Sequence, residues 1–264
     1  METGCRRAIL FLLFSPLFGT GFAQTETPVK VDKPLKSYSH WYFGAEYGVP
    51  FLFGDFTSFS ADKTYVGSQF GGFAGYQVNS WIGIEASART GYTRMGAKSY
   101  AGDYLMNADG MTYYTNQDFN TWKYKDVFSK VHFTNIGLQM NLNVNNFFGP
   151  NRGNRRWTVL LGPAVYAQHF STELINKADK SPLSGKKTDK WNIGIGGDVS
   201  LRYKISRAFD VQLRTGIIWV NNNKMDGIST LIKSKDHFMT SAGLSLIWKV
   251  GKKKEDNVLY ASRR

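Results

Sequence analysis

The sequence predicts an all-β protein, a transmembrane antiparallel up-and-down β-barrel of eight strands that follows an N-terminal signal peptide. Residues 135–144 alternate strictly between small polar and apolar side chains, which indicates a strand with one polar and one apolar face. A tilted strand of about 9–11 residues is long enough to cross a bilayer. Similar segments recur along the chain, and the connections between them alternate in length, as they do in outer-membrane barrels.

The N-terminal residues have the features of a targeting signal. Two arginines precede an apolar run at 8–18, and a small-x-small site ends at Ala23. The run is too short to cross a bilayer as a helix. We therefore expect residues 1–23 to be a signal peptide. It contains Cys5, the only cysteine, so we expect no disulfide or thiolate site in the mature chain.

Three segments follow the predicted signal. Residues 24–39 are polar and contain Pro28 and Pro34, so we expect a periplasmic linker. The barrel occupies 40–250, and 251–264 form a basic C-terminal tail. The chain has 33 Lys and Arg against 20 Asp and Glu, a net charge of +13. Because an exported chain does not meet nucleic acid, we assign this excess to solvated loops or to contact with anionic lipid head groups.

Eight segments carry the strand pattern: 41–49, 65–78, 81–93, 128–144, 157–170, 191–204, 208–220 and 238–250. Very short turns follow the second and sixth, and the turn at 145–156 is intermediate. Longer connections span 50–64, 94–127, 171–190 and 221–237. Outer-membrane barrels place their long loops outside the cell. An even strand number then puts both termini in the periplasm, so the expected location is the outer membrane of a Gram-negative cell.

Tryptophans mark the ends of the predicted strands, as in the aromatic girdles of membrane barrels. One set is expected at the periplasmic interface: Trp41, Trp81, Trp157 and Trp248. Trp191 and Trp219 belong to the opposite interface, and Trp122 falls in the longest loop.

The whole pattern resembles the OmpA-like family of eight-stranded outer-membrane barrels, in the form found in Bacteroidota. The resemblance covers about 40–250. It is carried by Phe-Ala-Gln at 22–24, Trp-Ile-Gly-Ile-Glu-Ala at 81–86, Trp-Asn-Ile-Gly-Ile-Gly-Gly at 191–197 and Gly-Leu-Ser-Leu-Ile-Trp at 243–248. The chain departs from the family at its end, where Gly-Lys-Lys-Lys-Glu-Asp follows the last strand instead of a terminal aromatic residue.

The resemblance implies a fold more than a function, because this fold hosts adhesins, anchors, secretion accessories and a few lipid enzymes. We predict a non-enzymatic structural or interaction role, such as a secretion accessory or surface attachment, with no cofactor. The expected partners are outer-membrane lipid and lipopolysaccharide, and a protein bound through the long loops or the tail. The alternatives are a lipid A-modifying enzyme of the deacylase type and a small diffusion channel.

One set of residues suggests the enzymatic alternative. His169, Ser171 and Glu173 share the lipid-facing side of the fifth strand. A His-x-Ser pair with a carboxylate resembles the site of lipid A deacylases, in which a base activates a serine toward an acyl ester. Thr172 stands where those enzymes usually have Asn. None of the four histidines has a second His or Cys at metal-ligand spacing, so we expect no metal site.

Charged residues on the inward faces predict a filled lumen: Glu46, Glu85, Arg89, Asp198, Arg202, Asp210 and Arg214. Eight strands enclose only as much space as side chains can fill. A short turn near 205–207 would place Asp198 opposite Arg214 and Arg202 opposite Asp210. In a hairpin the residue numbers of opposite partners add up to the same total, here 412. We expect these charges to plug the lumen; the alternative is the lining of an ion-selective pore.

Aromatic residues are concentrated in the longest loop: Tyr100, Tyr104, Tyr113, Tyr114, Phe119, Trp122 and Tyr124. Tyr and Trp are favoured at binding hot spots, so one interpretation is a partner surface. The other is that they pack on one another where barrel strands extend beyond the membrane.

Overall fold

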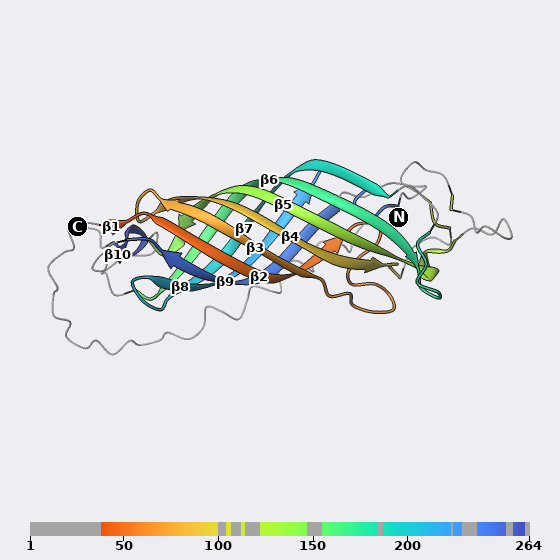
Figure 1. The fold of residues 1–264 in the computed structure, drawn as a ribbon, viewed down its shortest axis with the longest axis horizontal. Coiled ribbons are helices and arrows are strands. Elements are labelled where there is room, and N and C mark those ends of the chain that lie inside the picture. The colour runs from red at the N-terminus through yellow and green to blue at the C-terminus, as the bar shows by residue number, and fades with distance from the viewer. Residues whose placement is uncertain are drawn as a thin grey trace, which may run out of the picture. The chain divides into compact units, whose positions relative to one another are not determined.

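The computed structural model describes residues 38–99, 104–106, 112–113, 122–146, 155–183, 187–222, 224–228, 237–251 and 256–261. Eight strands close into an antiparallel barrel in chain order, β2 to β9 (Figure 1). Each strand pairs with the next in sequence, and β9 pairs with β2 to close the ring. The predicted eight-stranded up-and-down barrel is therefore confirmed. The predicted signal peptide at 1–23, most of the linker, and the aromatic residues Tyr100, Tyr114 and Phe119 lie outside the described residues.

The barrel strands are β2 (Trp41–Phe53), β3 (Ser68–Gln77), β4 (Ile82–Gly96), β5 (Val127–Asn143), β6 (Trp157–Asn176), β7 (Thr188–Lys204), β8 (Phe209–Val220) and β9 (His237–Lys249). Single-turn 3₁₀ helices precede and follow β5 and lie near the C-terminus: η1 (Tyr124–Asp126), η2 (Val144–Asn146) and η3 (Val258–Tyr260). Two short strands, β1 (Tyr38–Ser39) and β10 (Asp256–Asn257), form a separate parallel pair at one end of the barrel (Figure 1).

Several strands are longer than the sequence pattern predicts. β6 and β7 pair as far as Thr172 and Thr188, so the predicted loop at 171–190 is wrong and the connection spans only 177–187. β2 likewise reaches Phe53 and β4 reaches Gly96. A pattern of inward polar and outward apolar residues misses these extensions, because their inward residues are largely apolar, as at Leu52, Met95 and Leu174.

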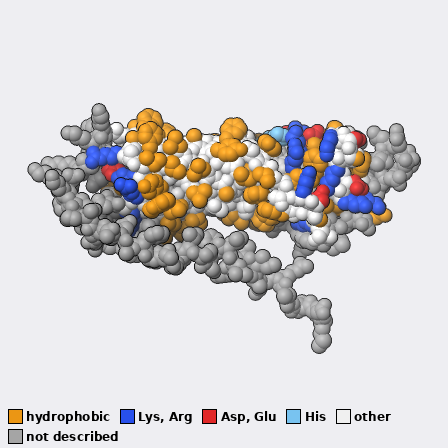
Figure 2. All heavy atoms as spheres, turned by 90° about the horizontal axis from the view of Figure 1, so that it is seen from below, with side chains coloured by type: hydrophobic (Ala, Val, Ile, Leu, Met, Phe, Trp, Pro, Cys, Tyr) orange, Lys and Arg blue, Asp and Glu red, His pale blue; other side chains and the backbone are white. Residues whose placement is uncertain are grey.

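Apolar side chains form a belt on the outside of the barrel, seen as orange spheres in Figure 2. Ile193, for example, is 79% exposed. Trp41, Trp157 and Trp248 are exposed at the end of the belt near the short turns, and Trp191 and Trp219 are exposed nearer the long loops. The belt and these aromatic residues match the exterior of a transmembrane barrel. Among the described residues, no helix is both long and apolar enough to span a bilayer.

The interior differs between the two halves of the barrel. In the half next to the short turns, hereafter the short-turn half, buried side chains are polar or charged, such as Glu85, Asn141 and Arg202. In the half next to the long connections, the long-loop half, an apolar core includes Leu52, Val131 and Phe170. The predicted polar lumen therefore occupies only part of the barrel.

Candidate functional site

The polar interior is built around Arg214 on β8, which is 3% exposed. Its Nη2 donates to Oε1 of Glu85 at 2.7 Å. Its other nitrogens lie 3.5 Å from Glu46 Oε2 and 3.7 Å from Asp198 Oδ2. Arg89 Nε lies 3.1 Å from Glu46 Oε1. These two arginines and three carboxylates come from four strands, β2, β4, β7 and β8, so their contacts tie different walls of the barrel together.

Neutral groups that sequence reasoning missed complete this network. Tyr42 Oη donates to Glu85 Oε2 at 3.0 Å, and Asn141 Nδ2 donates to both groups, at 2.9 Å to the hydroxyl and 3.2 Å to the carboxylate. A Cβ at Gly75 would stand 2.0 Å from Cζ of Tyr42, so a glycine there makes room for the ring. Inward Asn and Gln residues were a signal for such contacts, but the sequence does not say which strands they bridge.

The predicted pairing across the sixth and seventh strands is wrong by two residues. In the observed register Asp198 faces Gly216, and Ser200 faces Arg214. Lys204 pairs with Asp210, so the turn is two residues longer than predicted, and within it the backbone N–H groups of Ile205 and Ser206 both donate to the carbonyl of Phe209. The total of the paired residue numbers therefore becomes 414 instead of 412. Asp198 still approaches Arg214, but diagonally.

The other predicted pair does not form. Arg202 Nε donates to Gln212 Oε1 at 2.8 Å. Asp210 instead binds Lys249 Nζ at 2.5 Å, and it accepts a 2.8 Å hydrogen bond from the hydroxyl of Tyr260. The last contact comes from a segment that the sequence places outside the barrel domain.

Residues 256–260, hereafter the C-terminal plug, close the barrel mouth at the short-turn end. Leu259 and Tyr260 are buried and cluster with Leu160 of β6. Asp256 forms an ion pair with Lys204, and β10 pairs with β1. Residues 256–260 are therefore part of the barrel, because Tyr260 completes the polar interior at Asp210.

Residues 224–228, hereafter the Asp226 segment, fold into the opposite mouth. The Asp226 carboxylate accepts a 2.9 Å hydrogen bond from Phe56 N, and its carbonyl accepts one from Ser129 Oγ at 2.8 Å. Thr172 Oγ1 donates to the Met225 carbonyl at 2.6 Å. Burial raises the pKa of Asp226 to about 7. These hydrogen bonds hold the Asp226 segment against the apolar core.

Asp55, Asp226 and His237 bring potential ligand atoms within 4.8 Å of one another. The Met225 N–H donates to Nδ1 of His237 at 3.2 Å, which puts the proton of a neutral imidazole on Nε2. That Nε2 lies 3.5 Å from Asp226 Oδ2. The protonated nitrogen has no lone pair for a metal, so the geometry favours buried polar contacts among these residues over a metal site.

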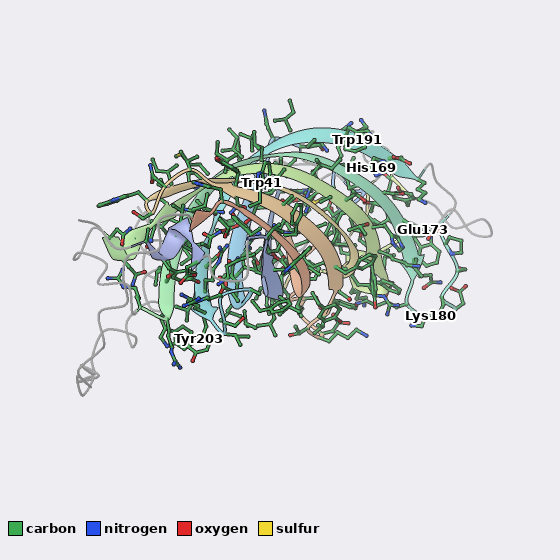
Figure 3. All side chains as sticks on the ribbon, turned by 60° about the vertical axis from the view of Figure 1, so that its left-hand side comes forward. Trp41, His169, Glu173, Lys180, Trp191 and Tyr203 are labelled. Atoms are coloured by element: carbon green, nitrogen blue, oxygen red, sulfur yellow. The ribbon has the colours of Figure 1, made fainter. Side chains whose placement is uncertain are left out.

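The three candidate catalytic residues lie on the outer wall of β6, in the long-loop half. His169 lies beside Trp191, and Glu173 lies farther toward the long-loop end (Figure 3). His169 Nε2 contacts Oδ1 of Asp189 on β7 at 2.6 Å. The carboxylate partner of His169 is therefore Asp189 and not Glu173. The hydroxyl of Ser171 is buried and makes no hydrogen bond within the described part of the chain, so the base does not engage the nucleophile.

The loop aromatics divide between the two interpretations. Tyr124 is buried and packs edge to face on Phe56, with ring centroids 5.5 Å apart. Tyr113 and Trp122 pack against the same apolar core. Tyr104 is 56% exposed. Of the residues described, most serve packing, and Tyr104 remains available to a partner.

No family model and no curated protein matches the chain. Several solved structures are similar in fold. Neisserial surface protein A has 12% identity and a TM-score of 0.43, over 80% of this chain and 97% of that one. Ail of Yersinia pestis, solved with the heparin analogue sucrose octasulfate, has 10% identity and a TM-score of 0.45, over 81% and 100%. OprG of Pseudomonas aeruginosa has 11% identity and a TM-score of 0.42, over 81% and 97%. Such distant similarity says nothing about function, and the Bacteroidota-type family stays a prediction.

Proposed function

We propose that this chain is an outer-membrane barrel with a non-enzymatic structural or surface-interaction role, that both its ends face the periplasm, and that its lumen does not conduct. One observation carries the proposal: the interior is filled at three levels. The C-terminal plug closes the short-turn mouth, the Arg214 network crosses the middle, and the Asp226 segment caps an apolar core at the other mouth. A diffusion channel needs a continuous aqueous path, which this filling opposes.

Conductance is the direct test. The purified chain is inserted into planar bilayers, and single-channel currents are expected to stay near baseline. A variant that ends at residue 251 removes the C-terminal plug, and its conductance should rise only slightly because the Arg214 network remains. Large, steady currents from the intact protein would refute the proposed closed lumen.

Location and orientation are tested separately. The mature protein should begin at Gln24, fractionate with the outer membrane, and migrate differently on gels before and after heating. Protease added to intact cells should cut the connection at 97–123, since exposed loops are the preferred sites of nicking. Cleavage confined to 145–156 would mean that the barrel is inserted in the opposite direction.

One contact favours a second candidate, an esterase that acts on lipid. The His169–Asp189 pair has the geometry of a base oriented by a carboxylate. Ser171 lies directly opposite Asp189 in the β6–β7 register. Mass spectrometry of lipid A from cells that express the native protein or Ser171→Ala is the test. A loss of deacylated species in the variant would support the esterase, and identical acylation would exclude it.

A further inference from the structure

A pocket of about 420 Å³ lies on the outer wall of the barrel, over β4, β5 and β6 at their long-loop ends. Its floor is apolar and consists of Phe128 and Ile175. Tyr65, from the connection between β2 and β3, stacks on Phe128 with ring centroids 6.2 Å apart. Although Phe128 points away from the lumen, it is only 8% exposed. The connections that cover it therefore build a fixed recess outside the barrel.

The sides of this recess, hereafter the basic pocket, are strongly cationic. Five basic residues line it: Lys63, Arg94, Lys130, Lys177 and Lys180. The one acidic lining residue is Asp62, so the lining carries five positive charges and one negative charge, a net of +4. Asp62 Oδ2 binds Lys177 Nζ at 2.8 Å, which leaves the other four charges uncompensated by the lining.

The fold holds these cations together despite their repulsion. Arg94 and Lys130 are direct partners across β4 and β5, a position in which like charges repel, while Glu173 faces Lys130 from its other side, on β6. Arg94 and Lys180 both lie over the Phe128 ring, at 5.8 and 5.7 Å from its centroid. Lys180 also has a left-handed backbone, with φ of 63°, which is uncommon outside glycine. An anion with several oxygens would relieve this repulsion and accept hydrogen bonds from the guanidinium and ammonium groups.

The height of the basic pocket relative to the apolar belt indicates where the anion comes from. On β5 the last exposed apolar residue of the belt is Ile136. Lys130 is six residues farther along the same face, about 20 Å at ~3.3 Å per residue. With a strand tilt of about 40°, this is roughly 15 Å above the level of Ile136. Figure 2 shows basic side chains gathered beyond the belt at this end, and Figure 3 places Lys180 there.

We propose that the basic pocket binds the phosphorylated saccharide head group of an outer-leaflet glycolipid, that is, lipopolysaccharide. The net charge of the pocket selects the phosphates, and its apolar floor offers a surface for a sugar ring. Its height matches the saccharide layer above the acyl chains. This inference rests on the proposed outer-membrane location and adds a specific lipid contact to it.

The test compares three probes on the intact, folded protein in detergent micelles: lipopolysaccharide, the same lipopolysaccharide after removal of phosphate, and the soluble phosphorylated saccharide after complete deacylation. The variant is Arg94→Gln with Lys130→Gln. The matched control is Lys123→Gln with Lys125→Gln, which removes the same charge from exposed positions at the same end. Heat-dependent gel migration verifies that all three proteins are folded.

The native protein and the control should bind lipopolysaccharide equally, and Arg94→Gln with Lys130→Gln should bind on the order of tenfold more weakly, because two charge-assisted contacts are lost. Removal of phosphate should weaken native binding similarly. Equal binding by the variant and the native protein, or unchanged binding after phosphate removal, would overturn the proposal. If the soluble saccharide bound as tightly as intact lipopolysaccharide, the ligand would be a free phosphorylated saccharide and not a membrane glycolipid. Fractionation and conductance do not depend on Arg94 or Lys130, so a failure of the proposed function would be seen independently.

Discussion

The two halves of β5 have opposite arrangements of polar and apolar side chains. From Asn135 to Asn143 the inward side chains are polar and the outward ones are apolar. From Val127 to Phe133 the inward side chains are mostly apolar, and Lys130 and His132 point outward. The backbone pairing continues unchanged through both halves. The side-chain pattern therefore follows the surroundings, which are lipid around residues 135–143 and water around residues 127–133.

This inversion gives the two interiors different chemistry. In the long-loop half, apolar residues pack as in a soluble protein, and their burial stabilises the fold by removing them from water. In the short-turn half, lipid already surrounds the exterior, so the interior is held by hydrogen bonds and ion pairs that must be satisfied. Each half should therefore respond differently to the same kind of substitution.

Removal of Arg214 is expected to have the largest effect. Arg214→Ala leaves Glu85, Glu46 and Asp198 facing one another without their central cation. Unfolding in urea should show a loss of about 3–5 kcal/mol. Adding Glu85→Ala should cost less than the sum of the single changes. The outward Arg94→Ala should cost about 0.5 kcal/mol or less. Strictly additive effects at Arg214 and Glu85 would contradict the network.

A lysine placed on the outer surface tests where the lipid ends. Leu138→Lys puts a charge in the belt, and we expect a loss of about 2–4 kcal/mol in phospholipid vesicles. His132→Lys changes an outward residue six residues farther along β5 and should stay within about 0.5 kcal/mol, because that position faces water. Similar losses at both positions would mean that the inversion does not mark the membrane boundary.

The C-terminal plug should contribute less. Tyr260→Phe removes the 2.8 Å hydrogen bond to Asp210, whose other partner Lys249 remains. Thermal unfolding should show a loss of about 1 kcal/mol. Tyr203→Phe is the matched control. The Tyr203 hydroxyl accepts an exposed 3.4 Å hydrogen bond from Arg156 Nη1, so its removal should have no measurable effect. No loss in Tyr260→Phe would mean that the plug is not bound to the mouth in solution.

A change of stability with pH is expected at the Asp226 segment. Burial raises the pKa of Asp226 to about 7 in the folded state, above its usual 3.8, so its contribution to stability is complete below pH ~4 and is lost as the pH rises through ~7. Burial opposes the ionised form, which hydrogen bonds from the backbone of Phe56, Ile228 and Asp55 and the charge of Lys98 favour. The slope stays below about 1.4 kcal/mol per pH unit, the limit for one proton.

Asp226→Asn should remove this dependence. The unfolding free energies of the native protein and the variant, measured from pH 4 to pH 8, should diverge in favour of the variant as the pH rises. Curves that remain parallel over that range would show that Asp226 does not titrate between the folded and unfolded states.

The sequence by itself determined the barrel, its eight strands and the identity of its inward charges. Those features depend on the alternation of polar and apolar side chains along a single strand, as at the outward Ile136 and the inward Gln139, and this alternation can be read without knowing which strands are neighbours. Only the tertiary structure decided that Arg214 binds Glu85, that Asp189 and not Glu173 contacts His169, and that Tyr260 enters the mouth. Each of these contacts joins residues from different strands or from the chain end. They depend on register and closure, and the longer turn after Lys204 moved the partner of Asp198 by two residues, from Arg214 to Gly216.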